Sequence, residues 1–190
     1  MEDSLQKTAG KIALLAGGGI DSSVCMQVLK NQGYKVRAIH VDYGQQASSF
    51  EWDAVQKVSR YFACDAVQVC VAGLPVRKGP EVVGRNAAFT FLALMALEAD
   101  ELGICLGIHR GTPFYDCSTV CYKQLDRLVQ EYTDSRILLL APLLEFSKKE
   151  IVDYAKSCAF PLALTYSCQE GVAGGCGHCH SCLDRENLQC

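Results

Sequence analysis

This sequence has little net charge, no long apolar run and no segment of low complexity. Its 18 Lys and Arg residues against 21 Asp and Glu residues leave a formal net charge of -3, so no basic surface for stable nucleic-acid binding is expected. No apolar run approaches the roughly 18 residues of a membrane-spanning helix, so no membrane partner is expected. The first ten residues are polar and carry no signal-peptide core, which predicts a cytoplasmic protein.

Expected strands and helices alternate along the chain. Five short apolar runs, typical of buried parallel strands, are separated by segments in which apolar residues recur at helical spacing. This order predicts an α/β fold built on a doubly wound parallel sheet. The expected strands lie at 11–16, 36–41, 66–71, 104–107 and 137–141, and the expected helices at 22–31, 50–62, 86–97, 121–132 and from Ser147, where Glu150 completes a capping box.

Composition divides the chain into three expected parts. A flexible tail is expected at 1–10, the α/β domain at 11–160, and a glycine- and cysteine-rich segment with little regular structure at 161–190. The helix at 86–97 is so apolar that it is expected to be buried on most sides. With 190 residues, 49% of them hydrophobic, the chain is long enough for one domain with a substantial core.

Three consecutive glycines follow the first expected strand. The run Ala16-Gly17-Gly18-Gly19-Ile20-Asp21-Ser22-Ser23 joins this strand to a helix at the carboxyl end of the sheet. Glycines let backbone N–H groups approach a ligand closely, and the helix N-terminus and serine hydroxyls add further donors. The run therefore predicts a phosphate-binding loop; a simple glycine turn with an Asp/Ser helix cap is the alternative.

This glycine loop differs from two common phosphate-binding motifs. It has no Gly-Lys-Ser/Thr, which excludes a Walker A loop, and Asp21 stands where a dinucleotide fingerprint needs a third glycine or alanine. It resembles the S-G-G-x-D-S pyrophosphate loop of the ATP-pyrophosphatase (PP-loop) superfamily, with Gly17 in place of the first serine.

Four of the twelve cysteines crowd into one short segment. Most of the others are scattered through apolar stretches, where they are expected to be small buried hydrophobes. Four thiolates close a tetrahedral site with no open position, which predicts a structural zinc. The expected ligands are Cys168, Cys176, Cys179 and Cys182; replacement of one of them by His178 or His180 and an iron–sulfur cluster are the alternatives.

Five motifs in this order resemble the 7-cyano-7-deazaguanine synthase family of queuosine and archaeosine biosynthesis. The similarity extends from Lys11 to Leu188, and a proline-leucine pair followed by Lys148 or Lys149 lies where the family has a helix lysine. The motifs are the glycine loop, Asp42-Tyr43-Gly44-Gln45, Gly84-Arg85-Asn86, Asp116-Cys117 and Gly175-Cys176-Gly177-His178-Cys179-His180-Ser181-Cys182.

The resemblance implies an adenine nucleotide alpha hydrolase-like fold and an ATP-dependent ligase. Family members adenylate 7-carboxy-7-deazaguanine with release of pyrophosphate, and ammonia then displaces AMP to give an amide. A second adenylation leads to the nitrile, 7-cyano-7-deazaguanine. The resemblance thus implies ATP, Mg²⁺ and structural Zn²⁺ as cofactors, a deazapurine and ammonia as small-molecule partners, and a homodimer.

The same resemblance implies roles for individual residues. ATP is expected to bind residues 16–23, and Asp21, Ser22 and Lys148 are expected to serve catalysis. Arg85 is the leading candidate for binding a carboxylate or phosphate, because its planar guanidinium fits either group. The expected substrate contacts are Tyr43, Gln45, Arg85, Asn86 and Asp116.

The sequence departs from the family pattern mainly where the substrate is expected to be covered. Two alternatives therefore stay open: transfer of the activated acid to another amine, such as a protein N-terminus, or a nucleotide-binding module without catalysis. The departures are Gly17 for serine, Gln46-Ala47 for a basic pair, Val83 for the proline before Gly84, and Tyr115 for the proline before Asp116.

Overall fold

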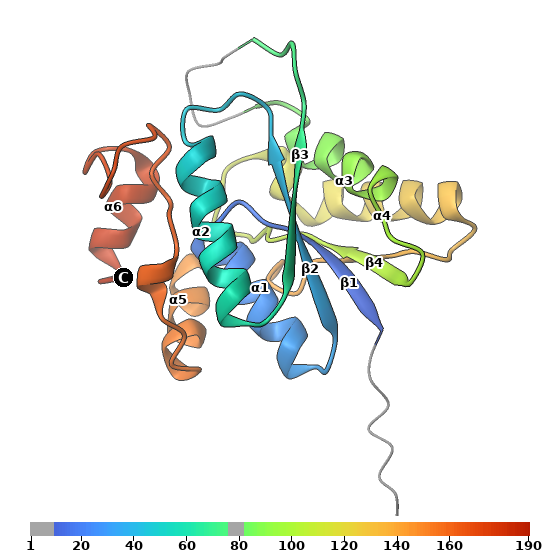
Figure 1. Cartoon of the computed structure of the whole chain (residues 1–190), viewed down its shortest axis with the longest axis horizontal. Coiled ribbons are helices and arrows are strands. Elements are labelled where there is room, and N and C mark those ends of the chain that lie inside the picture. Colours follow the sequence, from blue (N-terminus) through green and yellow to red (C-terminus); the bar gives the residue numbers. More distant parts are fainter. Residues whose placement is uncertain (1–9, 76–81) are drawn as a thin grey trace, which may run out of the picture.

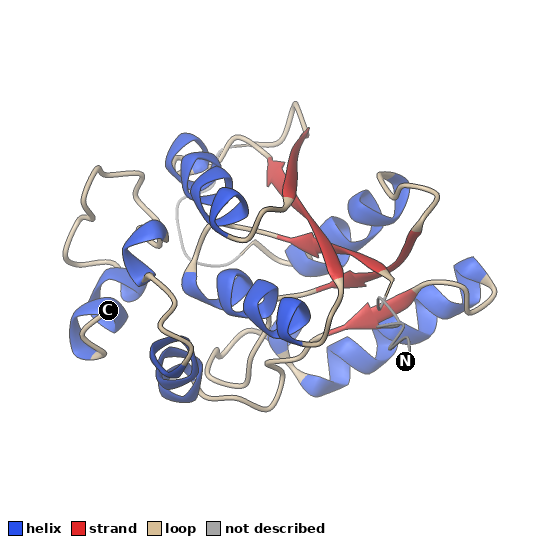
Figure 2. Ribbon diagram, turned by 60° about the horizontal axis from the view of Figure 1, so that its bottom comes forward, coloured by secondary structure: helices blue, strands red, loops and turns tan. Residues whose placement is uncertain are grey.

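A computed structural model describes residues 10–75 and 82–190. Five parallel strands form one sheet in the order β3-β2-β1-β4-β5 (Figures 1 and 2). The chain moves outward from β1 in both directions, so the crevice between β1 and β4 is the point where doubly wound sheets bind ligands. The strands are β1 (Lys11–Leu15), β2 (Lys35–Asp42), β3 (Asp65–Cys70), β4 (Glu101–Cys105) and β5 (Leu138–Leu140).

Helices cover both faces of the sheet (Figure 2). Along β1, Ile12 and Leu14 pack into one apolar cluster and Ala13 into the other, as the alternation of side chains in a strand requires. The first cluster lies under α1 (Ile20–Asn31), α2 (Ser48–Tyr61) and α5 (Lys148–Ser157), and the second under α3 (Arg85–Met95) and α4 (Thr119–Thr133). The predicted doubly wound α/β fold is confirmed.

The predicted capping box at the start of α5 is also confirmed. The Glu150 N–H donates to Ser147 Oγ, and the Ser147 N–H donates to Glu150 Oε2 at 2.7 Å. This cap fixes where α5 begins, and therefore where its first residue, Lys148, projects.

Three sequence predictions about the fold need correction. The strand expected at 104–107 begins at Glu101 and ends at Cys105, because the acidic Glu101 is buried in an ion pair that apolar patterning does not detect. Helix α3 buries only Thr90 and Ala93 and leaves Met95 85% exposed, because it is an outer layer with one face on the sheet. Segment 161–190, expected to be largely irregular, contains helix α6 (His180–Asn187) and a 3₁₀ turn at Leu162–Leu164.

Helix α6 is tied to the rest of the C-terminal segment by Arg185. The guanidinium of Arg185 donates to Thr165 Oγ1 at 2.8 Å and to the Leu162 carbonyl at 3.1 Å. The Tyr166 N–H donates to the Gly18 carbonyl at 2.9 Å, so the same segment lies against the glycine loop. The segment that carries the cysteines is thus packed onto the carboxyl end of the sheet.

The tail predicted at 1–10 lies, apart from Gly10, outside the described residues. Within the described ranges, none of the helices has the length and apolar character needed to cross a bilayer.

Candidate functional site

The glycine loop forms one wall of a cavity of about 300 Å³, which we call the loop cavity. Gly18 has a left-handed backbone (φ +70°), and a Cβ there would lie 2.6 Å from the Glu51 carbonyl, so only glycine lets α2 approach the loop. Gly17 is different, because a Cβ built on it meets nothing within 4 Å. Of the predicted ATP-binding residues, six line the loop cavity: Ala16, Gly17, Gly19, Ile20, Asp21 and Ser22.

The other two predicted ATP-binding residues lie on the opposite side of the loop. Gly18 and Ser23 face a small hollow beside Met26 and Val58. Ser23 Oγ donates to the Gly19 carbonyl at 2.8 Å, so its hydroxyl is used inside the first helical turn. Ser22 therefore lines the loop cavity, whereas Gly18 and Ser23 do not.

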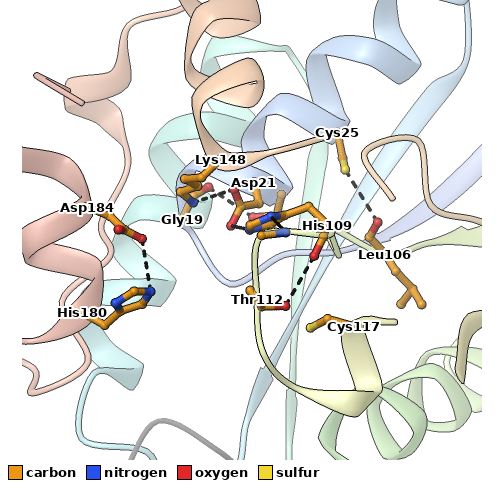
Figure 3. A network of polar contacts seen from close by, with 12 residues as sticks. Gly19, Asp21, Cys25, Leu106, His109, Thr112, Cys117, Lys148, His180 and Asp184 are labelled. Carbon is orange, nitrogen blue, oxygen red and sulfur yellow. Dashed lines mark hydrogen bonds and ion pairs between the residues drawn. The ribbon is translucent and has the colours of Figure 1, made fainter. Parts of the chain in front are cut away.

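Asp21 is the centre of a charged cluster in the loop cavity (Figure 3). Lys148 Nζ lies 2.6 Å from Asp21 Oδ1, and His109 Nε2 lies 3.7 Å from Asp21 Oδ2. Lys149, the alternative to Lys148 in the sequence, pairs instead with Asp153 at 2.7 Å on the exposed side of α5. The fold thus selects Lys148 from the two lysines.

Sequence reasoning missed His109. The Gly111 N–H donates to His109 Nδ1 at 3.0 Å, so in the neutral ring the proton sits on Nε2, which faces Asp21. Burial lowers the pKa of His109, which favours this neutral form. Its position just after β4, on the same edge as the glycine loop, was the signal that could have identified it.

A larger cavity of about 760 Å³, the outer cavity, adjoins the loop cavity. Three predicted substrate residues line it: Tyr43, Gln45 and Arg85. Gln45 is held in place because its Oε1 accepts from the Tyr43 N–H at 2.9 Å and its Nε2 donates to Glu51 Oε2 at 2.7 Å. The cavity is closed on another side by the C-terminal segment, including Cys179.

The two cavities share a wall. Arg85, in the first turn of α3, lines both of them, and among the described residues no hydrogen bond or ion pair engages its guanidinium. A guanidinium in a cavity wall that has no partner among the described residues is available to a carboxylate or a phosphate. The residues common to both linings are Tyr43, Gln45, Glu51, Arg85, Phe89 and Gln169.

Asn86 and Asp116 differ from the other predicted substrate residues. Asn86 lines the loop cavity only, and Asp116 is in neither described lining. The Asn86 N–H lies 3.3 Å from Asp116 Oδ2, and Asn86 Nδ2 donates to the Asp116 carbonyl at 3.2 Å. Asp116 therefore supports Asn86 from behind.

The four predicted cysteine ligands come together. Their Sγ atoms all lie within 4.8 Å of one another, and those of Cys176 and Cys182 are 3.9 Å apart. His178 and His180 turn away, since His178 Nδ1 contacts the Cys176 carbonyl and His180 pairs with Asp184 (Figure 3). The geometry therefore favours four sulfur ligands over a mixed set with histidine.

The backbone around Cys168 favours its thiolate. Burial by itself would raise the pKa of Cys168, but N–H groups of Val172, Glu170 and Cys176 donate to the sulfur and lower this pKa to about 6. A Cβ on Gly171 would collide with the Gln46 carbonyl, so this turn needs glycine to pack against Gln46, directly after the Asp42–Gln45 motif. The cluster is thus suited to bind a metal ion and is joined to the wall of the outer cavity.

Comparison with known proteins agrees with this geometry. The family described as "Queuosine biosynthesis protein QueC" matches residues 11–77 and 76–188. The 7-cyano-7-deazaguanine synthase of Methanothermobacter thermautotrophicus is 26% identical over 201 residues, which cover 90% of each chain. The enzyme of the same name from Campylobacter jejuni subsp. doylei is 26% identical over 206 residues, covering 92% of this chain and 91% of that one.

The fold is shared with a solved structure. The U34-tRNA thiolase NcsA from Methanococcus maripaludis, solved with its [4Fe-4S] cluster, superposes with a TM-score of 0.59 at 17% identity, covering 98% of this chain and 66% of that one. At this identity the likeness concerns the fold alone. Because the family match spans nearly the whole chain from β1 to α6, this protein belongs to the QueC family of queuosine biosynthesis proteins.

Proposed function

We propose that this protein is a 7-cyano-7-deazaguanine synthase, an ATP-dependent ligase that converts 7-carboxy-7-deazaguanine and ammonia into the nitrile. The observation that carries the proposal is the wall shared by the two cavities, in which Arg85 lines both. An acid in the outer cavity and the α-phosphate of ATP in the loop cavity would meet at this wall, and adenylation requires that proximity. The outer cavity also has the volume expected of a small-molecule site.

ATP would bind with its pyrophosphate on the loop amides. The free backbone N–H groups between Gly17 and Ser22 lie at the N-terminus of α1, where partial positive charge favours an anion. Lys148, held by Asp21, would add positive charge as pyrophosphate departs. Asp21 Oδ2 has only a 3.7 Å contact to His109, so it retains capacity to ligate Mg²⁺, which when bound neutralises phosphate charge.

The chemistry then proceeds in two activations. A carboxylate oxygen of the acid attacks the α-phosphate, pyrophosphate leaves, and Arg85 holds the acid at the shared wall. Ammonia attacks the acyl carbon and AMP departs with the electron pair of the broken C–O bond. The resulting amide oxygen is adenylated by a second ATP, and loss of the second AMP gives the nitrile.

We propose zinc as the metal of the cysteine cluster. A tetrahedral ion with zinc–sulfur bonds of about 2.3 Å separates its sulfurs by about 3.8 Å, close to the 3.9 Å between Cys176 and Cys182. A [4Fe–4S] cluster bonds each thiolate to a different iron and holds the sulfurs further apart. The zinc would hold α6 and the adjoining turn as one wall of the outer cavity.

We also propose a cytoplasmic homodimer. All twelve cysteines are free, which suits a reducing compartment. The outer sides of α3 and α4 expose Met95 and Tyr132, and the ring of Tyr132 packs edge-on against Phe91. An exposed apolar surface of this kind supports self-association, which light scattering of the purified protein would measure.

The test is turnover of the acid. Purified protein, ATP, Mg²⁺ and 7-carboxy-7-deazaguanine should give AMP, pyrophosphate and, with ammonia, a product of nitrile mass. Arg85→Lys keeps the charge but loses the planar two-point contact, so we expect about a 10-fold to 100-fold loss in kcat/KM. Arg127→Lys, in an exposed pair with Glu131, is the matched control and should not change turnover.

The outcomes separate the three functions considered. AMP formation without nitrile, together with a mass shift on an added amine or peptide, would favour transfer to another amine. ATP binding without acid-dependent AMP formation would favour a non-catalytic module. Wild-type turnover in Arg85→Ala would remove Arg85 from the site.

A further inference from the structure

Glu51 is a carboxylate at the junction of the two cavities. It lies in the first turn of α2, lines both the loop cavity and the outer cavity, and its side chain is 26% exposed. Gln45 Nε2 donates to its Oε2 at 2.7 Å. The motif analysis did not single out this residue, and the adenylation step does not use it.

His40 lies directly behind Glu51. It is 1% exposed on β2 and lies beside Trp52, with ring centroids 5.9 Å apart. Its Nδ1 lies 3.0 Å from the Ala16 carbonyl, and since a carbonyl only accepts, Nδ1 carries the proton and Nε2 is a bare acceptor. Nε2 has no hydrogen-bond partner among the described residues, and it lies 4.0 Å from Glu51 Oε2.

A buried imidazole acceptor without a partner is costly, so it calls for an explanation. The other ring nitrogen of His40 is paired with the Ala16 carbonyl, and Glu51 Oε2 accepts from Gln45. The remaining lone pair faces the carboxyl group that borders both cavities. The pair can therefore take up a proton at the place where acid, nucleotide and nitrogen would meet.

Conversion of a carboxylate into a nitrile requires such a group. A nitrile nitrogen keeps none of the three protons of ammonia, so three N–H bonds must break at one nitrogen. The first proton leaves as nitrogen bonds to the acyl carbon and the C–O bond to AMP breaks. The other two leave after the amide oxygen is adenylated, as the second C–O bond breaks and the C≡N bond forms.

We propose that Glu51, supported by His40, is the catalytic base that accepts these protons from the substrate nitrogen. This role rests on the proposed function. A carboxylate takes one proton for each N–H bond broken, and His40 Nε2 accepts a hydrogen bond from, or the proton of, the resulting carboxylic acid. The proton then passes to solvent through the outer cavity, and the base is regenerated for the next step.

The surroundings tune this base. Burial raises the pKa of Glu51 above its usual range, whereas the hydrogen bond from Gln45 and the nearby Arg85 lower the pKa and Asp42 raises it. Tyr166, from the C-terminal segment, lines the loop cavity together with Glu51. Because only the carboxylate accepts a proton, the nitrogen-transfer rate should rise as pH increases through the pKa of Glu51.

The test separates adenylation from nitrogen transfer in the whole protein. Adenylation is followed by the exchange of labelled pyrophosphate into ATP in the presence of 7-carboxy-7-deazaguanine. This exchange needs no catalytic base, because the nucleophile is the ionised carboxylate of the substrate. We expect Glu51→Gln to slow amide formation about 100-fold or more, but to slow exchange less than about 3-fold. Asp53→Asn, two residues along the same helix in an exposed pair with Lys57, should slow neither.

His40→Asn is the second variant. Asparagine can still donate to the Ala16 carbonyl but lacks Nε2. Because the bare Nε2 of His40 can accept a hydrogen bond from the protonated carboxyl group, it favours the acid form of Glu51, so its removal should shift the rising limb of the pH–rate profile for amide formation to lower pH. Dividing this profile by that of the wild type cancels the titration of ammonia itself.

Five results would overturn the proposal or a part of it. Equal losses in exchange and amide formation by Glu51→Gln, or a rise in KM for the acid alone, would show that Glu51 binds the purine. An unshifted profile in His40→Asn would remove His40 from the proton path. A wild-type protein without acid-dependent pyrophosphate exchange would refute the proposed function as well. If the wild type shows exchange and Glu51→Gln forms the amide at the wild-type rate, only the role of Glu51 is refuted.

Discussion

The two ends of the sheet bury charged side chains in different ways. Near the amino ends of β2 and β4, Arg37 and Glu101 form a two-point ion pair, with Nε–Oε1 at 2.8 Å and Nη2–Oε2 at 2.5 Å. Arg37 also donates to the Ala96 carbonyl at the end of α3, and Glu101 accepts the Glu98 N–H. Both side chains are almost fully buried, and the pair joins α3 to the sheet.

At the carboxyl ends the charged groups are left partly available. Asp21 and Lys148 pair but remain in the wall of the loop cavity, Arg85 lies in the shared wall, and His40 keeps a bare nitrogen toward Glu51. The amino end thus uses its charges for stability, since each has a protein partner. The carboxyl end leaves capacity for a ligand, as expected where loops of an α/β sheet meet.

The largest effect should come from the structural part of the carboxyl end, the cysteine cluster. Cys176→Ala leaves an incomplete metal site, and four-ligand zinc sites contribute about 10–16 kcal/mol of binding energy to folding in small domains. We expect the C-terminal segment to detach and the protein to aggregate. Elemental analysis and circular dichroism would test this, with the exposed Cys70→Ala as a control that keeps its metal and its fold. A well-folded wild-type protein without zinc would contradict it.

Breaking the amino-end pair should lower stability without a specific effect on chemistry. Arg37→Ala leaves the Glu101 carboxylate buried without its partner, which typically costs about 3–5 kcal/mol. Urea denaturation would measure the loss. Arg127→Ala removes an exposed i,i+4 pair with Glu131 and should cost at most about 0.5 kcal/mol. If the folded fraction of Arg37→Ala has reduced kcat, the division of roles between the two ends is wrong.

The adjacent lysines of α5 sharpen the comparison. Lys148→Ala removes the cation beside Asp21 and should lower kcat about 100-fold to 1000-fold, the usual loss for a group that stabilises developing charge. Lys149→Ala removes a solvated pair with Asp153 and should leave kcat unchanged. Steady-state pyrophosphate release would distinguish them, and similar rates for the two variants would contradict the assignment.

The smallest effect concerns Gly17. A side chain there meets nothing within 4 Å, so Gly17→Ser should fold normally and add a hydroxyl donor to the loop cavity. One added hydrogen bond is worth about 1 kcal/mol, so pyrophosphate release should rise by up to about 5-fold. Gly18→Ser is the contrasting variant and should destabilise the protein, because its Cβ would strike the Glu51 carbonyl. An unchanged or lower rate in Gly17→Ser would mean that the loop is adapted to another phosphate geometry.

The sequence by itself determined the features that are local in the chain. The strand–glycine–helix passage at 11–31, the capping box at Ser147 and Glu150, and the four cysteines between 168 and 182 all depend on residues a few positions apart. Turns, caps and close ligand spacing are short-range effects, so their patterns predicted both the fold class and the metal cluster. The ordered motifs added the family.

Only the tertiary structure decided which distant side chains meet. It selected Lys148 over Lys149, brought His109 to Asp21, set His40 behind Glu51 and moved Asp116 out of the cavity wall. It also buried Glu101 at the start of a strand and exposed much of an apolar helix. These outcomes depend on how strands pair and on which face each helix covers, and such long-range contacts leave no periodic mark in the sequence.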